Sequence, residues 1–274
     1  MWLKLFKFIS ITIIFFYGCS NNPQSEKLIN IPKEKLSLNK IYSLALDDFN
    51  SGKATEAISK FKVVEKDYSY TDWGPKAVLM IAYIYYETGA CNLSLSTLEK
   101  FFKSYPNDAN TIYAKYLKGL CYYSEISTYD KDQTKTKEAI KYFNNLIGEY
   151  PNTEYATDAQ YKIEALRDNL AAKELYLARF YMDREKWNTA LGKLQFIIEN
   201  YQDTIFIEEA LHRKVEIYHK LGLAEEAKIT AAILGYNYNN SDWYKKSYKL
   251  VGDKNFGDNK KKSTVLDSFK KVFN

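Results

Sequence analysis

Apolar side chains recur along this chain in a pattern that is repeated five times. In one copy, the small residue Ser94 is followed by Leu98 four residues later, Phe101 seven later and Tyr105 eleven later. This spacing places the four side chains on one face of an α-helix, and Pro106-Asn107 marks the end of that helix. The other four copies are Ala57, Phe61, Val64 and Tyr68; Ala139, Phe143, Leu146 and Tyr150; Ala190, Leu194, Ile197 and Tyr201; and Ala227, Ala231, Leu234 and Tyr238.

A second helix is predicted before each copy. Amphipathic runs cover Ile41–Asn50, Lys76–Thr88 and Glu209–Leu221. Gly52, Gly89 and Gly222 each lie five residues before the small residue, where a helix ends in the left-handed conformation that glycine tolerates best. The terminal tyrosines are 37, 45, 51 and 37 residues apart, which matches the roughly 34-residue tetratricopeptide period plus insertions. The pattern predicts an all-α fold, a right-handed α-solenoid of about five tetratricopeptide-type helix pairs over residues 36–245.

Two places depart from the simple period. The third repeat contains a polar, lysine-rich insertion, Thr128–Lys137, which we expect to be a surface loop. In the fourth repeat, Tyr155–Arg184 contains neither proline nor glycine over 30 residues. We therefore predict one long helix that serves two repeat units.

The first 18 residues have the features of a signal peptide. Lys4 and Lys7 precede the apolar run Phe8–Tyr17, which is too short to cross a bilayer. Gly18-Cys19 then follows, which is similar to a lipoprotein signal in which Cys19 becomes the acylated first residue. Ser20 after it is similar to the outer-membrane version, and several acyl chains suffice for stable anchoring. The alternative is an ordinary signal peptide with an incidental cysteine.

Two further segments lie outside the repeats. Residues 19–35 are polar and contain Pro23 and Pro32, which indicates a flexible tether. Residues 246–274 form a basic C-terminal extension. Its part from Gly252 to Asn274 is lysine-rich and is interpreted as either a disordered tail or a short helix for a partner. From Cys19 onward the chain has 37 basic and 34 acidic side chains. This balance argues against nucleic-acid binding.

No sequence motif for catalysis is present: the phosphate-binding, dinucleotide-binding, nucleophile-elbow and metalloprotease patterns are all missing. His212 and His219 are seven residues apart, about 10 Å along a helix, so we expect exposed or packing side chains rather than metal ligands. The pairs Glu208-Glu209 and Glu225-Glu226 are interpreted as solvated helix starts. We expect neither an enzyme nor any cofactor other than the covalent lipid on Cys19.

Cys91 and Cys121 remain once Cys19 is lipidated. If equivalent positions of the repeats are superposed as parallel helices, the two residues are offset by about 10 Å, which exceeds disulfide reach. The expectation is two small buried thiols, although an oxidising compartment leaves a disulfide open.

The first helices of the first three repeats carry a stripe that is rich in aromatic residues. We expect it to line a groove that binds an extended peptide, because tyrosine offers both stacking area and a hydroxyl. The alternative is that these side chains pack between helices. Lys115 and Lys118 favour it, because a register that points the tyrosines into the groove (the groove register) would place these two lysines at packing positions. The stripe residues are Asn39, Tyr42, Leu46 and Phe49; Lys76, Leu79, Tyr83 and Tyr86; and Tyr113, Tyr116, Leu120 and Tyr123.

Several stretches resemble one family, the BamD lipoproteins of the outer-membrane β-barrel assembly machinery. The resemblance spans about Leu36 to Tyr244. Its residues are Ala82 to Tyr86 before Phe-Phe-Lys-Ser-Tyr-Pro-Asn, Tyr116-x-x-Gly119-Leu120, Tyr150 to Ala159, Arg167 to Ala171, Ala178-x-Phe180-Tyr181 and Tyr201-Gln202-Asp203-Thr204.

The resemblance implies a scaffold that is lipid-anchored at the periplasmic face of the outer membrane. Its first repeats would receive the C-terminal β-signal of unfolded outer-membrane β-barrel proteins, and its later repeats would dock BamA alongside other machinery subunits. Lys193 and Tyr201 are the docking candidates. Lys193 stands where family members can carry an arginine, and lysine lacks the two-pronged guanidinium with which arginine binds a carboxylate. The alternative is a generic periplasmic tetratricopeptide lipoprotein that coordinates cell-wall or division proteins. Substrate preference and accessory subunits are left open.

Overall fold

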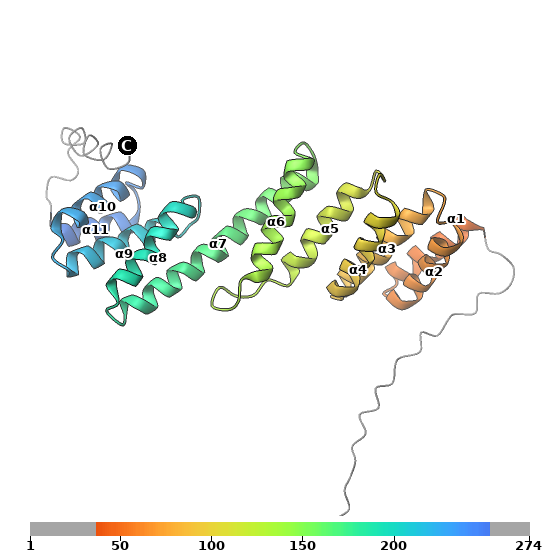
Figure 1. Cartoon of the computed structure of the whole chain (residues 1–274), viewed down its shortest axis with the longest axis horizontal. Helices are drawn as coiled ribbons and strands as arrows, with labels where there is room; N and C mark the ends of the chain where they lie inside the picture. Colours follow the sequence, from red (N-terminus) through yellow and green to blue (C-terminus); the bar gives the residue numbers. More distant parts are fainter. Residues whose placement is uncertain (1–36, 253–274) are drawn as a thin grey trace, which may run out of the picture. The chain divides into compact units, whose positions relative to one another are not determined.

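The protein is described by a computed structural model that covers residues 37–252, and this part of the chain consists of helices and their connections (Figure 1). The predicted all-α fold is confirmed. The helices are α1 (Leu38–Asn50), α2 (Ala54–Asp67), α3 (Trp73–Glu87), α4 (Cys91–Ser104), α5 (Thr111–Ser124), α6 (Thr134–Glu149), α7 (Glu154–Met182), α8 (Trp187–Asn200), α9 (Ile207–Lys220), α10 (Ala224–Asn237) and α11 (Asp242–Val251).

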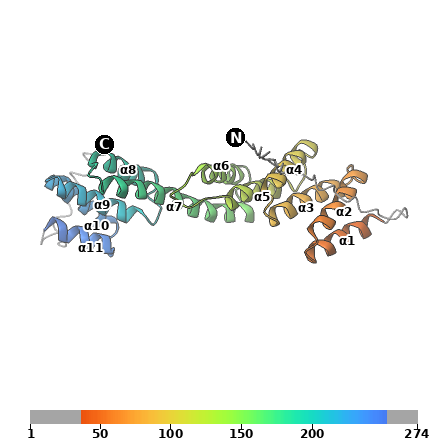
Figure 2. The same cartoon turned by 90° about the horizontal axis from the view of Figure 1, so that it is seen from below.

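Each helix packs mainly against the helices that precede and follow it in the chain. Figures 1 and 2 show the successive pairs from α1/α2 to α9/α10 following one another, which is the arrangement of an α-solenoid. In such a fold a helix pair cannot bury its apolar face alone, so neighbouring pairs supply the core.

The repeat pattern found in the sequence forms this core. The three inward positions of every copy are between 0 and 1 % exposed. Phe61, Phe101 and Phe143 are the largest fully buried side chains; Phe61 and Phe143 occupy the second position of their copies and Phe101 the third. Burying one such side chain contributes about 1.5–3 kcal/mol, so the repeated spacing accounts for much of the stability of each pair.

The terminal tyrosine of each copy is the residue that ends the second helix. Tyr68, Tyr105, Tyr150, Tyr201 and Tyr238 have φ between −130° and −138°, so the backbone leaves the helical conformation at this residue. Each backbone N–H still donates to the carbonyl four residues earlier. The rings stay half-buried against the preceding turn and cover the end of the core.

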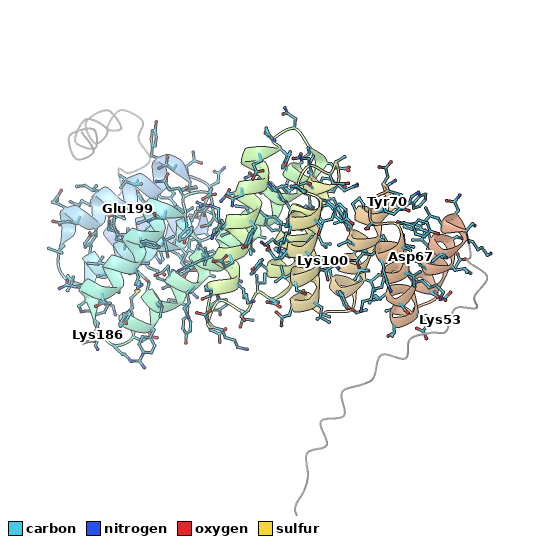
Figure 3. All side chains as sticks on the ribbon, turned by 45° about the vertical axis from the view of Figure 1, so that its right-hand side comes forward. Lys53, Asp67, Tyr70, Lys100, Lys186 and Glu199 are labelled. Atoms are coloured by element: carbon cyan, nitrogen blue, oxygen red, sulfur yellow. The ribbon has the colours of Figure 1, made fainter. Side chains whose placement is uncertain are left out.

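The turns between paired helices use the predicted left-handed residue. Gly52, Gly89 and Gly222 have φ of 76°, 75° and 72°. In the fourth repeat the same position, five residues before Ala190, is Glu185 with φ 53°. The residues that follow this position, Lys53 in the first repeat and Lys186 in the fourth, precede the second helix of their pairs (Figure 3).

The predicted long helix in the fourth repeat is confirmed as α7, which has 29 residues. Ala159, Ile163 and Leu166 in its first half pack with the core of α6, whereas Leu175 and Ala178 in its second half pack with that of α8. One helix thus joins two units without a turn between them.

The predicted loop Thr128–Lys137 is wrong at its C-terminal end, because α6 begins at Thr134. The buried Thr136 hydroxyl donates to the Gln133 side chain at 2.8 Å, which stabilises the first turn of α6. The preceding segment lies on α7, where Asn169 donates to the Ser127 carbonyl at 3.1 Å and Lys173 to the Asp130 carbonyl at 2.8 Å.

Helix α11 crosses the domain boundary that we expected at residue 245. It packs against α9 and α10, and Ser247 in its middle is fully buried. Ser241 caps its start by accepting from the Trp243 N–H at 3.1 Å, and Gly252 ends it with φ 66°. The packed helices therefore extend to Val251. The expected signal peptide with Cys19, the tether and the segment after Gly252 lie outside the described residues.

The predicted separation of Cys91 and Cys121 is wrong. Both thiols are buried, and they lie within hydrogen-bonding reach of each other. The error came from comparing equivalent positions of parallel helices. The helices that meet here are α4 and α5, which are consecutive and antiparallel.

Candidate functional site

Three of the predicted groove residues of the first repeat, Tyr42, Leu46 and Phe49, are partly buried, whereas Asn39 is exposed. The Tyr42 ring packs edge-on against Phe61 at 5.1 Å and against Trp73 at 4.8 Å between ring centroids. Phe49 contacts Tyr83 of the next repeat at 5.8 Å in the same manner. Burial raises the pKa of Tyr42. Tyr42 therefore joins three helices, in agreement with the packing alternative at this position.

Four predicted tyrosines of the second and third repeats come together with a fifth in one group, here called the tyrosine cluster: Tyr83, Tyr86, Tyr113, Tyr116 and Tyr155. The Tyr155 ring, from the start of α7, lies 5.8 Å from Tyr113 and 5.2 Å from Tyr116. All five rings are half-buried. Burial raises the pKa of Tyr113, and the neighbouring Tyr83, Tyr155 and Tyr86 add to this effect. The structure thus brings α3, α5 and α7 together at these tyrosine side chains. Tyr155 was missed, although it falls in the quoted stretch Tyr150 to Ala159.

A carboxylate lies at the α7 side of the tyrosine cluster. The Tyr116 hydroxyl donates to Asp158, which also accepts from Lys162. Burial works to raise the pKa of Asp158, but the hydrogen bonds from Lys162 and Tyr116 outweigh it and leave the pKa below its usual range. Burial and the same hydrogen bond raise the pKa of Tyr116. Tyr116 consequently stays a neutral donor at physiological pH.

Tyr123, the last predicted groove residue, lies on the far side of a close helix contact. Its ring is 6.3 Å from Phe143, and the Tyr116 ring is 6.2 Å from Phe143 on the other side. Gly119 lies between them on α5, where a Cβ atom would approach the Phe143 ring to 2.5 Å. Only glycine allows this approach without a shift of the ring.

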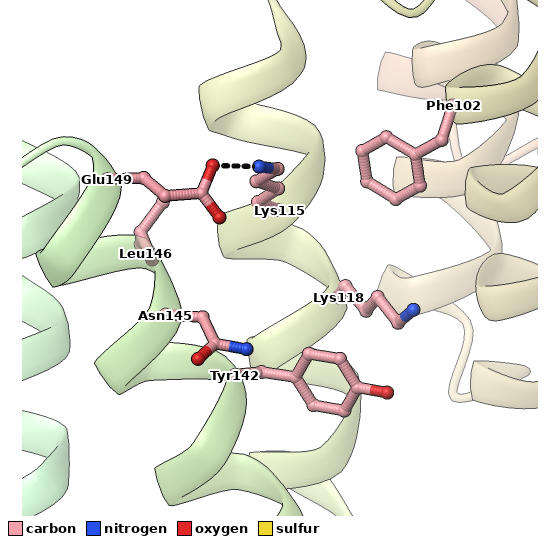
Figure 4. Close-up of a pocket in the computed structure, with 7 residues that line it drawn as sticks. All are labelled: Phe102, Lys115, Lys118, Tyr142, Asn145, Leu146 and Glu149. Carbon is pink, nitrogen blue, oxygen red and sulfur yellow. Dashed lines mark hydrogen bonds and ion pairs between the residues drawn. The ribbon is translucent and has the colours of Figure 1, made fainter.

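Lys115 and Lys118 line a pocket between α4, α5 and α6, so they lie at the packing positions that the groove register gives them (Figure 4). Lys118 pairs with Glu99 at 2.5 Å and lies 4.7 Å from the centroid of the Tyr142 ring. Lys115 pairs with Glu149. The lysine stems thus cover apolar surface while a glutamate neutralises each charge.

The predicted docking residues Lys193 and Tyr201 lie on α8 and at its end, near one carboxylate. Lys193 forms an ion pair with Glu174 of α7 at 2.8 Å. Burial raises the pKa of Tyr201, and Glu174 adds to this rise. The Arg167 guanidinium lies 5.4 Å from the Tyr201 ring and forms a two-point ion pair with Asp203 at 2.7 and 2.5 Å. Glu174 therefore connects the two candidates.

Glu209 does not occupy a solvated helix start, so that prediction is wrong. The side chain is 7 % exposed and accepts from Arg179 at 3.1 Å and from Arg213 at 3.0 Å. Two guanidinium groups compensate for its burial. Glu225 and Glu226 are exposed, as expected.

The two histidines have different surroundings. His219 is exposed, whereas His212 is buried and exchanges a hydrogen bond with Ser247 of α11 at 2.8 Å. His212 also contacts Glu216 at 3.5 Å. Burial works to raise the pKa of Glu216, but hydrogen bonds from His212 and Arg213 lower it to about 2. We call Arg179, Glu209, Arg213, Glu216, His212 and Ser247 the charged network.

Within residues 37–252, no group of three or more histidine, cysteine, aspartate or glutamate side chains has the arrangement of a metal site. Within the same part of the chain, no helix combines the length and apolar character that a membrane crossing requires.

Comparison with known proteins gives consistent matches. BamD of Caulobacter vibrioides, named an outer membrane protein assembly factor, is 35 % identical over 236 residues, which cover 86 % of this chain and 76 % of that protein. Its counterpart from Rickettsia prowazekii is 33 % identical over 252 residues and covers 91 % of this chain and 98 % of its own length. The family model YfiO, described as outer membrane lipoprotein, matches residues 34–233. This chain therefore belongs to the YfiO family of outer membrane lipoproteins.

Proposed function

We propose that this protein is a lipid-anchored scaffold of outer-membrane β-barrel assembly that joins substrate recognition to a partner, BamA. The observation that carries the proposal is the family match together with relatives that are named outer membrane protein assembly factors. The anchor would be acylated Cys19, with the solenoid on the periplasmic face of the membrane. The protein would act by binding rather than by catalysis.

The tyrosine cluster supports the recognition half of this proposal. A β-signal is a short extended strand whose backbone N–H and C=O groups need partners and whose alternate side chains need pockets. The raised pKa values of Tyr113 and Tyr116 keep both hydroxyls protonated. The Tyr113 hydroxyl can donate to a strand carbonyl or accept from an N–H, whereas the Tyr116 hydroxyl, which donates to Asp158, can accept from an N–H. The half-buried rings offer apolar surface beside them.

The surroundings of Lys193 support the docking half. Phe196 is 42 % exposed and contacts Tyr201 edge-on at 5.9 Å, while Ile205 after the same helix is 76 % exposed. Exposed apolar side chains beside a lysine–glutamate pair are the composition of a protein interface with a polar rim. We assign this surface to BamA.

A pull-down tests the partner. Detergent-solubilised protein should retain BamA at moderate salt, and Lys193→Glu should reduce the amount retained, because it places a second negative charge beside Glu174. Lys103→Glu, an exposed lysine on α4, is the matched control and should retain BamA normally. If wild-type protein retained no BamA, a generic periplasmic lipoprotein that coordinates cell-wall or division proteins would replace this proposal.

Titration of a labelled β-signal peptide tests the groove. Replacing Tyr83, Tyr86 or Tyr116 with alanine should weaken binding by roughly 1–2 kcal/mol where the ring is a central anchor. Replacement with phenylalanine should cost about 1 kcal/mol or less, because only the hydroxyl is lost. Tyr42→Ala is the comparison variant. Because the Tyr42 ring packs between helices, this variant should have a lower melting temperature with little change in peptide binding. If all variants kept their affinity and melted lower, the tyrosines would serve packing alone.

Mass spectrometry of the mature amino terminus tests the anchor. We expect an acylated Cys19 as the first residue. An unmodified Cys19, or cleavage at another position, would contradict the anchor and leave the two binding sites to be judged on their own experiments.

A further inference from the structure

Helices α4 and α5 meet in a regular antiparallel register, in which each step along one helix is matched by an equal step back along the other. At one end of this contact the facing residues are small, which lets the helices approach closely. At the other end they belong to one buried core, which includes Leu98, Phe101, Ala114 and Leu117. The contact between Cys91 and Ser124 sets the register. In this register Ser94 faces Cys121, Leu98 faces Leu117, and Phe101 faces Ala114.

The two cysteines lie together at the small-residue end. The Cys91 sulfur is 3.1 Å from the Ser124 hydroxyl, and Ser124 lies one turn beyond Cys121 on the same face of α5. Ser124 in turn donates to the Cys121 carbonyl at 2.9 Å. Ser94 and Cys91 are the neighbouring side chains whose hydrogen bonding shifts the pKa of the Cys121 thiol. Cys91 and Cys121 are 4 % and 0 % exposed. We propose that Cys91 and Cys121 are a redox pair that forms a disulfide between α4 and α5 and cross-links the second repeat to the third.

The reaction needs an external disulfide as oxidant. The thiolate of Cys91, the more exposed of the two, attacks one sulfur of the oxidant, forms a mixed disulfide and releases the first thiolate. The thiolate of Cys121 then attacks Cys91 and releases the second. In total the two protein thiols lose two protons and two electrons, and the oxidant is reduced to two thiols. Burial raises the pKa of Cys121 to about 12, so the second step is slow unless α4 and α5 separate locally.

The cross-link would lie beside the tyrosine cluster. Tyr86 packs against the core that α4 and α5 share. Burial raises the pKa of Tyr86, and Glu87, Cys121 and Cys91 each add to this rise. A bond between α4 and α5 would fix the spacing of α3 and α5, the two helices that carry Tyr86 and Tyr113. The cross-link itself does not depend on the proposed function.

The test uses the full chain with Cys19→Ser, so that only Cys91 and Cys121 can react. Oxidised glutathione in excess should remove two hydrogens from the intact mass without adding glutathione, and a non-reducing digest should contain the Cys91 and Cys121 peptides linked. The oxidised chain should melt roughly 10 °C higher than the reduced chain, because the bond closes a long loop. Cys91→Ser in the same background is the control and should show neither change.

Two results would overturn the proposal. One is that, when the chain is exposed to the oxidant and then unfolded, both thiols are still fully alkylated, so that no disulfide has formed. The other is that the chain accumulates glutathione on each cysteine or links only to a second chain. Since the readout is mass, neither result depends on peptide binding or on BamA.

Discussion

The contacts of α7 with its neighbours differ between its two ends. At its start, Tyr155 and Asp158 meet two tyrosines of α5, Tyr113 and Tyr116, through rings and a hydroxyl. Near its end, Arg179 meets Glu209 and the rest of the charged network of α9 and α11. Tyrosine contacts are short-ranged and offer the same groups that a peptide strand would use, whereas paired charges hold their partners in fixed orientations. The first end is suited to receiving a ligand and the second to holding helices in place.

The largest effect is expected from removing the ring beneath the tyrosine cluster. Phe143→Ala leaves a cavity at a fully buried position beside Tyr116 and Tyr123 and should reduce the free energy of unfolding by about 3–5 kcal/mol. Denaturant unfolding measures it. Phe196→Ala removes an equal ring from an exposed position and should cost far less. Equal losses would show that burial does not distinguish the two positions.

The next effect is expected in the charged network. Glu209→Gln removes the charge that Arg179 and Arg213 share, and it should cost about 1–3 kcal/mol, below the figure for a fully buried pair because both arginines reach solvent. Glu226→Gln, at an exposed position, is the matched control. If Glu209→Gln melted like the control, the network would contribute no stability.

A smaller, pH-dependent effect is expected at Glu216. Its pKa is about 2 in the folded chain and 4.5 ordinarily, so the stability that it contributes is present above pH 4.5 and is lost as pH falls towards 2. At pH 7 the free energy of unfolding of the wild type should exceed that of Glu216→Gln by about 1–2 kcal/mol, and this difference should be smaller at pH 3. A difference that is constant with pH would contradict the pKa shift.

The smallest effect is expected from Tyr116→Phe. The change keeps every ring contact and removes one donor to Asp158, which retains Lys162, so unfolding should change by about 1 kcal/mol or less. The pKa of Asp158 should rise, because one of the hydrogen bonds that lower it is lost. Carboxyl titration by NMR measures this rise, and an unchanged value would place the Tyr116 hydroxyl elsewhere.

The sequence predicted the features that depend on local spacing. Ser94, Leu98 and Phe101 are buried as expected because they recur with the period of one helix, and Gly52 adopts positive φ because a helix ends there. The long helix was predictable since nothing between Tyr155 and Arg184 interrupts it. These properties are determined within one helix and its two ends.

The errors concern contacts between helices. Glu209 resembled a solvated helix start, but its partner Arg179 lies 30 residues away, and no local pattern connects them. Cys91 and Cys121 were misplaced because the repeat relates equivalent helices, whereas neighbouring helices make the contact. The alternation of antiparallel helices, applied to the anchors Leu98 and Leu117, would have given the correct register.

The unbroken helix α7 has a mechanical consequence. A turn between its two halves would let them pivot, whereas a continuous ladder of backbone hydrogen bonds resists bending along all 29 residues. The segment before α6 braces its middle through Asn169 and Lys173. A force applied to Arg179 by a bound partner would therefore be transmitted along the helix to Tyr155 and Asp158. Helix α7 is a rigid connection between two repeats rather than a hinge.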